Sequence, residues 1–279
     1  MQILTETFEL TNGVQIPKVG FGTWQVPAGE TTVTAVKDAL KAGYRHIDTA
    51  WQYGNEASVG TAIRNSGIAR ADIFVTTKLP AKSKTYSESL HYFEESLQNL
   101  SLDYVDLYLI HAPWPWNEMG ADYSKENVEV WRAMETIYKS GRAKAIGISN
   151  FNVQDQQNIL AHCEIAPMVN QLQYYIGYTE PQNVKFAQNN EMLVEAFSPL
   201  ATGFLLNNQQ VKAIAEHYKV SVAQLAIKYC LSHDILPLPK AINPQHIAEN
   251  TKLDFEISAV DLAKLDQLTD TAPGEEHNA

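Results

Sequence analysis

The feature that most constrains the fold is a regular alternation of short apolar segments with segments of helical periodicity. Eight strand candidates occur along the chain, and each is followed by apolar residues at helical spacing or by helix-capping residues. The strand candidates are 19–24, 45–49, 73–78, 104–110, 145–150, 168–172, 193–197 and 235–240. Strands that alternate with helices predict an α/β protein with a parallel sheet.

Eight strand-helix units in about 240 residues fit a closed (β/α)8 TIM barrel, which typically needs about 250 residues. An open doubly wound sheet is the alternative. Polar residues follow six of the eight strand candidates, and only a ring brings six such positions to one mouth. An open sheet would spread them along a crevice of roughly 25 to 30 Å, at about 4.8 Å per strand. We therefore predict a single barrel domain over residues 1–279.

The two ends of the chain carry further signals. Apolar and polar residues alternate on both sides of Asn12-Gly13, which predicts an N-terminal β-hairpin that closes one end of the domain. Pro237 and Pro239 lie in the eighth strand candidate, so that strand can only be short. Residues 271–279 are polar and acidic, which predicts a disordered tail.

Charge and composition exclude several classes of function. The formal charge is -11 and no run of basic residues interrupts it, which argues against nucleic acid or an anionic membrane as a partner. The N-terminus lacks a secretion signal and no apolar stretch could span a membrane, so we expect a cytoplasmic protein. Cys163 and Cys230 lack CxxC spacing, and the eight histidines show no HxH or HExxH pattern. We therefore expect buried thiols and no metal site.

Four reactive side chains follow three consecutive strand candidates. Asp48 lies near the end of the second and Tyr53 follows it, Lys78 ends the third, and His111 follows the fourth. If these strands are neighbours in a parallel sheet, the four side chains meet at the carboxyl end, which is the catalytic face of a barrel. Each residue alone has an ordinary structural explanation, such as a surface ion pair, a packing tyrosine or a loop cap. Their common location favours a shared site.

These four residue types suit the reduction of a carbonyl group. The Lys78 ammonium needs a counter-charge in a partly dry site, and Asp48 is the natural one. The cation would lower the pKa of Tyr53, which would then be a usable acid near neutral pH. A neutral His111 could donate a hydrogen bond to a substrate oxygen. Lys78 could instead be the nucleophile of a Schiff-base lyase, which is the competing enzymatic hypothesis.

Several ordered motifs resemble those of the aldo-keto reductase family, over about residues 8 to 270. They are Gly43–Glu56, Lys78-Leu79, Leu109–His111, Gly147–Asn150, Val169–Gln171, Phe197–Leu200, and Pro239-Lys240 with Ile247–Asn250. The length is similar to that of small bacterial members that reduce diketo sugar acids, aldehydes and related carbonyls. The resemblance implies a nicotinamide cofactor bound across the barrel mouth without a Rossmann domain. In agreement, Gly20–Gln25 lacks the third glycine of a dinucleotide fingerprint.

The resemblance also implies a role for each matching residue. Tyr53 would be the proton donor, Asp48 and Lys78 would tune it, and His111 would orient the carbonyl for hydride transfer. The implied cofactor contacts are Thr23, Trp24, Asp48, Ser149, Asn150, Gln171, Phe197, Ser198, Pro199, Leu200, Lys240, Ala241, His246, Glu249 and Asn250. The implied substrate contacts are Trp24, Trp51, Tyr53, His111 and Trp114. We expect a monomer that acts on small carbonyl compounds; a non-catalytic, cofactor-binding relative is the remaining alternative.

The sequence departs from the family pattern at two places. Lys240 matches the lysine that meets the adenosine 2'-phosphate, but Ala241 replaces a usual serine and His246 a usual arginine. Arginine binds phosphate with a permanently charged fork, whereas histidine is mostly neutral at pH 7. We therefore expect NADPH as the cofactor, with appreciable use of NADH. Pro80 and Ala112 replace two usual tryptophans, which predicts a wider substrate opening unless the tryptophans of loop 112–127 refill it.

Overall fold

The computed structural model describes residues 2–272 and shows a (β/α)8 barrel, as predicted. The barrel strands are β3 (Phe21–Gly22), β4 (His46–Asp48), β5 (Phe74–Leu79), β6 (Val105–Ile110), β7 (Ala143–Ser149), β8 (Val169–Gln173), β9 (Leu193–Phe197) and β10 (Leu236–Leu238). All neighbouring strands are parallel, and their order in the sheet follows the chain.

Hydrogen bonds between the first and last strands close the ring. The backbone N–H groups of Gly20 and Gly22 donate to the carbonyl oxygens of Pro237 and Pro239, at 3.1 and 3.0 Å. Prolines lack an N–H but can accept, so β10 is short and still completes the barrel. A Cβ atom on Gly22 would lie 3.1 Å from the Leu238 carbonyl oxygen, so glycine permits this close approach. The open sheet is thereby excluded.

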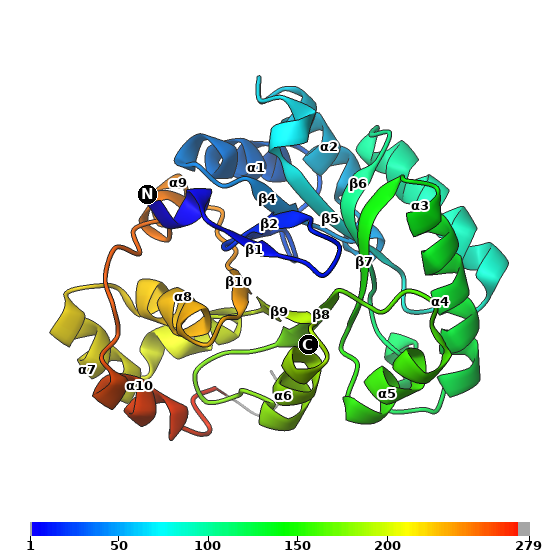
Figure 1. Cartoon of the computed structure of the whole chain (residues 1–279). Coiled ribbons are helices and arrows are strands. Elements are labelled where there is room, and N and C mark those ends of the chain that lie inside the picture. Colours follow the sequence, from blue (N-terminus) through cyan, green and yellow to red (C-terminus); the bar gives the residue numbers. More distant parts are fainter. Residues whose placement is uncertain (1, 273–279) are drawn as a thin grey trace.

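Helices surround the barrel (Figure 1). They are α1 (Glu30–Ala42), α2 (Glu56–Arg64), α3 (Tyr86–Leu100), α4 (Ser124–Lys139), α5 (Val153–His162), α6 (Pro181–Asn189), α7 (Gln209–Tyr218), α8 (Val222–Ser232), α9 (Pro244–Glu249) and α10 (Ala259–Asp266). The capping residues act as their positions predict: Thr85 accepts from the Glu88 N–H, and Ser221 and Gln224 form a reciprocal capping box.

The N-terminal hairpin closes one end of the barrel. Its strands β1 (Thr7–Glu9) and β2 (Gln15–Pro17) are antiparallel, and Figure 1 shows them lying across the centre of the ring. Leu10 and Ile16 belong to a buried cluster with Phe74 and Met168, which lie at the starts of β5 and β8. The hairpin therefore covers the amino-terminal end of the strands and leaves the carboxyl end for the site.

The predicted disordered tail, residues 271–279, is contradicted at its first two residues. Thr271 and Ala272 are buried, and the Thr271 hydroxyl donates to the backbone oxygen of Ile176. These two residues are thus packed, and the predicted disordered tail is wrong for them. The rest of it, residues 273–279, lies outside the described residues.

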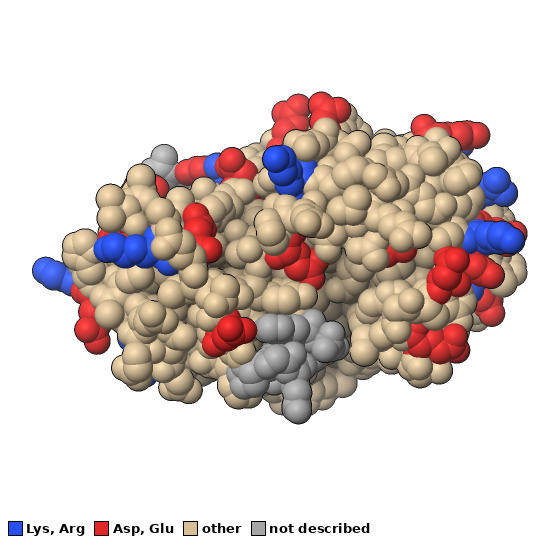
Figure 2. All heavy atoms as spheres, turned by 90° about the horizontal axis from the view of Figure 1, so that it is seen from below, with Lys and Arg blue, Asp and Glu red and all other residues tan. Residues whose placement is uncertain are grey.

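Charged groups are dispersed over the surface. On the face shown in Figure 2, lysine and arginine side chains stand apart from one another among acidic groups and form no continuous basic patch. Within residues 2–272, no helix has the length and apolar character that crossing a membrane requires.

Candidate active site

Four polar side chains meet at the carboxyl end of three adjacent strands. Lys78 on β5 donates from Nζ to both carboxylate oxygens of Asp48, at 2.7 and 2.8 Å. The same Nζ lies 3.3 Å from the phenol oxygen of Tyr53, which ends the 3-10 helix η2 (Trp51–Tyr53) after β4. The ring of His111, just beyond β6, contacts the Tyr53 ring edge-on with centroids 5.5 Å apart. The structure thus brings all four predicted residues together.

The charge of Lys78 is held in place by its surroundings. Its side chain is fully buried. Burial alone would lower the pKa of this ammonium, but the Asp48 carboxylate and Tyr53 outweigh burial and hold the pKa above its usual value. Lys78 also donates to the backbone oxygen of Thr49 at 2.9 Å. The group is therefore a fixed cation at neutral pH.

The two proton-carrying groups beside Lys78 are both uncharged at neutral pH. Burial raises the pKa of Tyr53; the Lys78 charge acts against this and Asp48 adds to it, so the pKa ends above its usual value. The predicted net lowering of the Tyr53 pKa is therefore wrong: the Lys78 charge does act downward, but desolvation of the phenolate outweighs it. Burial and the Lys78 charge hold the pKa of His111 well below its usual value. The phenol therefore keeps its proton, and the imidazole is neutral as predicted.

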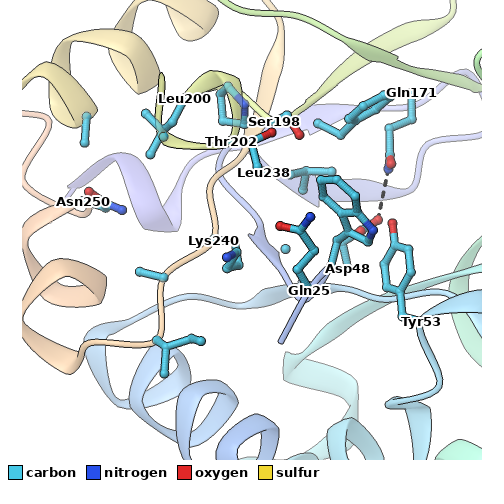
Figure 3. Close-up of a pocket in the computed structure, with 18 of the residues that line it drawn as sticks. Gln25, Asp48, Tyr53, Gln171, Ser198, Leu200, Thr202, Leu238, Lys240 and Asn250 are labelled. Carbon is cyan, nitrogen blue, oxygen red and sulfur yellow. Dashed lines mark hydrogen bonds between the residues drawn. The ribbon is translucent and has the colours of Figure 1, made fainter. Parts of the chain in front are cut away.

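A second polar group adjoins the first. Gln171 on β8 donates from Nε2 to Asp48 Oδ2 at 3.0 Å, the dashed contact in Figure 3, and to Glu195 Oε2 at 2.7 Å. The Ser149 hydroxyl at the end of β7 donates to the backbone oxygen of Gln171 at 2.9 Å. Side chains of β4, β7, β8 and β9 thereby link these four strands by hydrogen bonds.

Asn150 links this group to the loop that carries His111. It adopts a left-handed backbone conformation with φ of 61°, which asparagine tolerates better than most residues. Its Nδ2 donates to the backbone oxygen of His111 at 2.9 Å and to the Ser149 hydroxyl at 3.1 Å. The strained turn after β7 therefore helps to place the imidazole.

A cavity of about 910 Å³ runs along the mouth of the barrel. Figure 3 shows Tyr53 and Asn250 on opposite sides of it, with Lys240 between them. The predicted site residues that line it are Trp24, Asp48, Tyr53, His111, Ser149, Asn150, Gln171, Phe197, Ser198, Pro199, Leu200, Lys240, Ala241, His246, Glu249 and Asn250. Thr23 is the exception among the predicted cofactor contacts: it is buried, and its hydroxyl donates to the backbone oxygen of Asp48.

The part of the cavity between Tyr53 and Asn250 holds one fixed cation. Lys240 is the one lysine or arginine among the described residues that line the cavity, and Ala241 and His246 lie beside it in the lining. Burial lowers its pKa, and no carboxylate of residues 2–272 forms an ion pair with it. A cation without a counter-charge is suited to bind an anionic group of a ligand.

The aromatic wall near Tyr53 differs from the prediction. Trp24 and Trp116 line the cavity. Trp116 begins the short 3-10 helix η4 (Trp116–Glu118) and contacts the His111 ring edge-on, with centroids 5.4 Å apart. Trp114 packs edge-on against Trp116, with centroids 5.3 Å apart, and is not among the residues that line the cavity; its predicted substrate contact stays a prediction. Trp116 thus lines the cavity from the loop that follows Ala112.

Trp51 also lies away from the cavity. Its indole N–H donates to Glu95 Oε2 on α3 at 3.0 Å, and its ring packs against Tyr92 with centroids 5.0 Å apart. This side chain joins η2 to α3, and the predicted substrate contact of Trp51 stays a prediction.

Some lining residues were missed by sequence reasoning. They include Gln25, Gln52, Leu206 and Ser221. Gln25 and Ser221 lie outside helices and strands, and Gln52 and Leu206 lie in short 3-10 helices; in neither setting does a periodicity indicate which way a side chain points. The buried Glu195 was also missed, although a glutamate in the middle of an apolar strand candidate was a usable signal.

The fold and site define a barrel protein with a long ligand cavity, which is lined by the Tyr53 phenol at one end and by the Lys240 cation further along. Comparison with known proteins identifies the family. The model of the Aldo/keto reductase family matches residues 18–270. The chain therefore belongs to the aldo/keto reductase family and is an oxidoreductase.

Individual relatives support this assignment. The chain is 42% identical over 266 residues to a glyoxal reductase of Bacillus subtilis, with 95% of this chain and 93% of the relative covered. A crystal structure of an aldo/keto reductase from Brucella melitensis matches with a TM-score of 0.87 and 40% identity, covering 94% of this chain and 98% of that one. An aldo-keto reductase of Bombyx mori in complex with NADP matches with a TM-score of 0.86 and 32% identity, covering 96% and 94%.

Proposed function

We propose that the protein reduces aldehydes and ketones to alcohols with NADPH, and that Tyr53 supplies the proton. One observation carries the proposal: at one end of a long cavity, the Tyr53 phenol lies 3.3 Å from the buried Lys78 ammonium and in ring contact with a neutral His111. The relative named glyoxal reductase supports an aldehyde as substrate. The Bombyx mori structure supports NADP as the cofactor.

The residues that line the cavity fit a nicotinamide dinucleotide. Ser149, Asn150 and Gln171 offer hydrogen-bonding groups for the carboxamide, and Phe197 offers an aromatic face for the ring. Lys240 is the cation available to the 2'-phosphate. When bound, the cofactor supplies the hydride. Because no arginine of residues 2–272 lines the cavity beside Lys240, we propose that NADH is also used, with weaker discrimination than a lysine and an arginine together would give.

The chain's own groups perform the proton chemistry. The neutral His111 donates a hydrogen bond to the substrate carbonyl and orients it beside Tyr53. The raised pKa of Tyr53 keeps its proton in place until negative charge develops on the carbonyl oxygen. Lys78 then stabilises the phenolate that remains, and Asp48 keeps Lys78 charged and aligned.

The geometry disfavours the Schiff-base alternative. A lysine nucleophile needs a lowered pKa, and the pKa of Lys78 is raised. Its three N–H bonds are also directed at Asp48, Thr49 and Tyr53. Trapping of a substrate adduct on Lys78 with borohydride would favour the lyase over hydride transfer.

Initial rates of NADPH and NADH oxidation, measured against aldehydes, ketones, diketones and keto sugars, test the proposal. We expect turnover with both cofactors, a higher kcat/KM with NADPH, and alcohol as the product. Cofactor binding without turnover on any of these carbonyls would support a non-catalytic relative and overturn the proposal.

A further inference from the structure

Glu195 is a fully buried carboxyl group for which the proposed reaction has no role. It lies in the middle of β9, whose other residues are apolar. Its Oε2 accepts a hydrogen bond from Gln171 Nε2 at 2.7 Å. Its Oε1 lies 4.0 Å from His46 Nε2 and has no hydrogen-bond partner in the described part of the chain. Burying a carboxyl group with one oxygen lacking a hydrogen-bond partner costs free energy of folding, so the presence of Glu195 calls for an explanation.

The surroundings of Glu195 favour its uncharged form. Burial and then the negative charge of Asp48 raise the pKa of Glu195 to about 8, against the opposing effects of Gln171 and Lys78. His46 on β4 is neutral too, because burial and the Lys78 charge lower its pKa to about 3. Since Oε2 accepts from Gln171, the proton of Glu195 belongs on Oε1, the oxygen that faces His46.

The contact with Glu195 determines how the Gln171 amide is turned. A glutamine amide can present either its nitrogen or its oxygen to a neighbour. Here two acceptors hold the nitrogen, Asp48 Oδ2 at 3.0 Å and Glu195 Oε2 at 2.7 Å, so both of its hydrogens are used. No described residue donates to Gln171 Oε1, and Gln171 lines the cavity. The amide oxygen is therefore the group offered to a ligand.

We propose that Glu195 is a positioning residue: it fixes the Gln171 amide so that Oε1 accepts a hydrogen bond from the carboxamide NH2 of nicotinamide. The inference rests on the proposed function. Asp48 and Glu195 each engage one of the two N–H groups, so together they hold the amide plane in this orientation. A flipped amide would turn its oxygen towards the Asp48 carboxylate, and Glu195 Oε2 would lose its N–H donor. Glu195 thus acts on the cofactor through Gln171.

Two substitutions separate this role from a general packing role. Glu195→Gln has the shape of an uncharged glutamate and keeps an acceptor for Gln171. Glu195→Met has a similar length but offers Gln171 only a weak sulfur acceptor. If the methionine variant does not fold, Glu195→Thr replaces it, since a β-branched residue suits a strand and is too short to reach Gln171.

Dissociation constants of three ligands give the test. They are NADP+, 2'-phospho-ADP-ribose, which lacks nicotinamide, and the 3-acetylpyridine analogue of NADP+, whose methyl ketone cannot donate. We expect Glu195→Gln to bind NADP+ within about twofold of wild type, and Glu195→Met on the order of threefold to tenfold more weakly, the range of one net hydrogen bond. The other two ligands should bind all variants equally.

Two results would overturn the inference. Unchanged NADP+ affinity in Glu195→Met would show that the contact with Gln171 does not matter for the cofactor. Equal weakening of all three ligands would show a merely structural effect. Failure of the wild-type protein to bind both NADP+ and 2'-phospho-ADP-ribose is a different outcome, because it would refute the proposed function itself.

Discussion

The substitution Asp48→Asn tests the electrostatic basis of the site. Wild-type Lys78 is fully buried and bonds to both Asp48 oxygens, at 2.7 and 2.8 Å. At this separation, with an effective dielectric constant of about 20, the attraction between the two charges is roughly 6 kcal/mol. Removing one partner of a buried ion pair costs about 3 to 5 kcal/mol of unfolding free energy. Asparagine keeps one oxygen acceptor for Lys78, so we expect a loss of about 3 kcal/mol at pH 7.

The loss of unfolding free energy in Asp48→Asn should become smaller as the pH rises. In the wild type, the pKa of Lys78 lies above its unfolded value, so its stabilisation is complete below the unfolded pKa and disappears only as the pH passes the folded pKa. Without Asp48, burial leaves the folded pKa of Lys78 below the unfolded value. Between the folded and the unfolded pKa of Lys78 in the variant, the unfolded chain binds more protons than the folded one. The unfolding free energy of the variant therefore increases with pH in this range.

Urea denaturation at about pH 7 and pH 9.5 measures both effects, with Asp103→Asn as the matched control. Asp103 is exposed and forms no ion pair within residues 2–272. The control should lose less than about 0.5 kcal/mol at either pH. A loss below about 1 kcal/mol in Asp48→Asn at pH 7, or a loss that grows towards pH 9.5, would refute the reasoning.

Three further predictions concern the ligands and the pH profile. His246→Arg should tighten NADPH binding by about 1 kcal/mol, roughly fivefold, and leave the Kd of NADH unchanged; equal effects on both cofactors would contradict the 2'-phosphate assignment. Trp116→Ala should raise KM for small aldehydes severalfold, because it removes the aromatic wall beside His111, without altering the Kd of NADPH; an unchanged KM would exclude Trp116 from the substrate site. Because the pKa of His111 is well below its usual value, kcat for reduction should show no acid limb near pH 6.5, whereas a titration there would indicate a charged imidazole.

Much of the fold could be predicted because its determinants are local. Alternation of apolar segments with helical periodicity placed β9 at 193–197 and β5 within one residue of its bounds. The meeting of Asp48, Tyr53 and Lys78 followed from one further rule, that neighbouring parallel strands share a carboxyl end. The short β10 followed from its two prolines.

The orientation of loop side chains could not be predicted in the same way. Trp51, Trp114 and Trp116 all follow barrel strands, but only Trp116 faces the cavity. The direction of Trp51 depends on Glu95, a residue 44 positions away on α3, and no local pattern encodes that partner. The net pKa of Tyr53 was also beyond sequence reasoning, because desolvation and the Lys78 charge oppose each other and burial depth decides between them.

The central claim, that Tyr53 delivers the proton during carbonyl reduction, is tested most directly by Tyr53→Phe. The rate of NADPH oxidation with an aldehyde and the Kd of NADPH should be measured for both proteins. We expect the rate to fall by about 10² to 10⁴, the usual contribution of a general acid, while the Kd stays within about twofold. A variant that keeps most of the wild-type rate would contradict the claim.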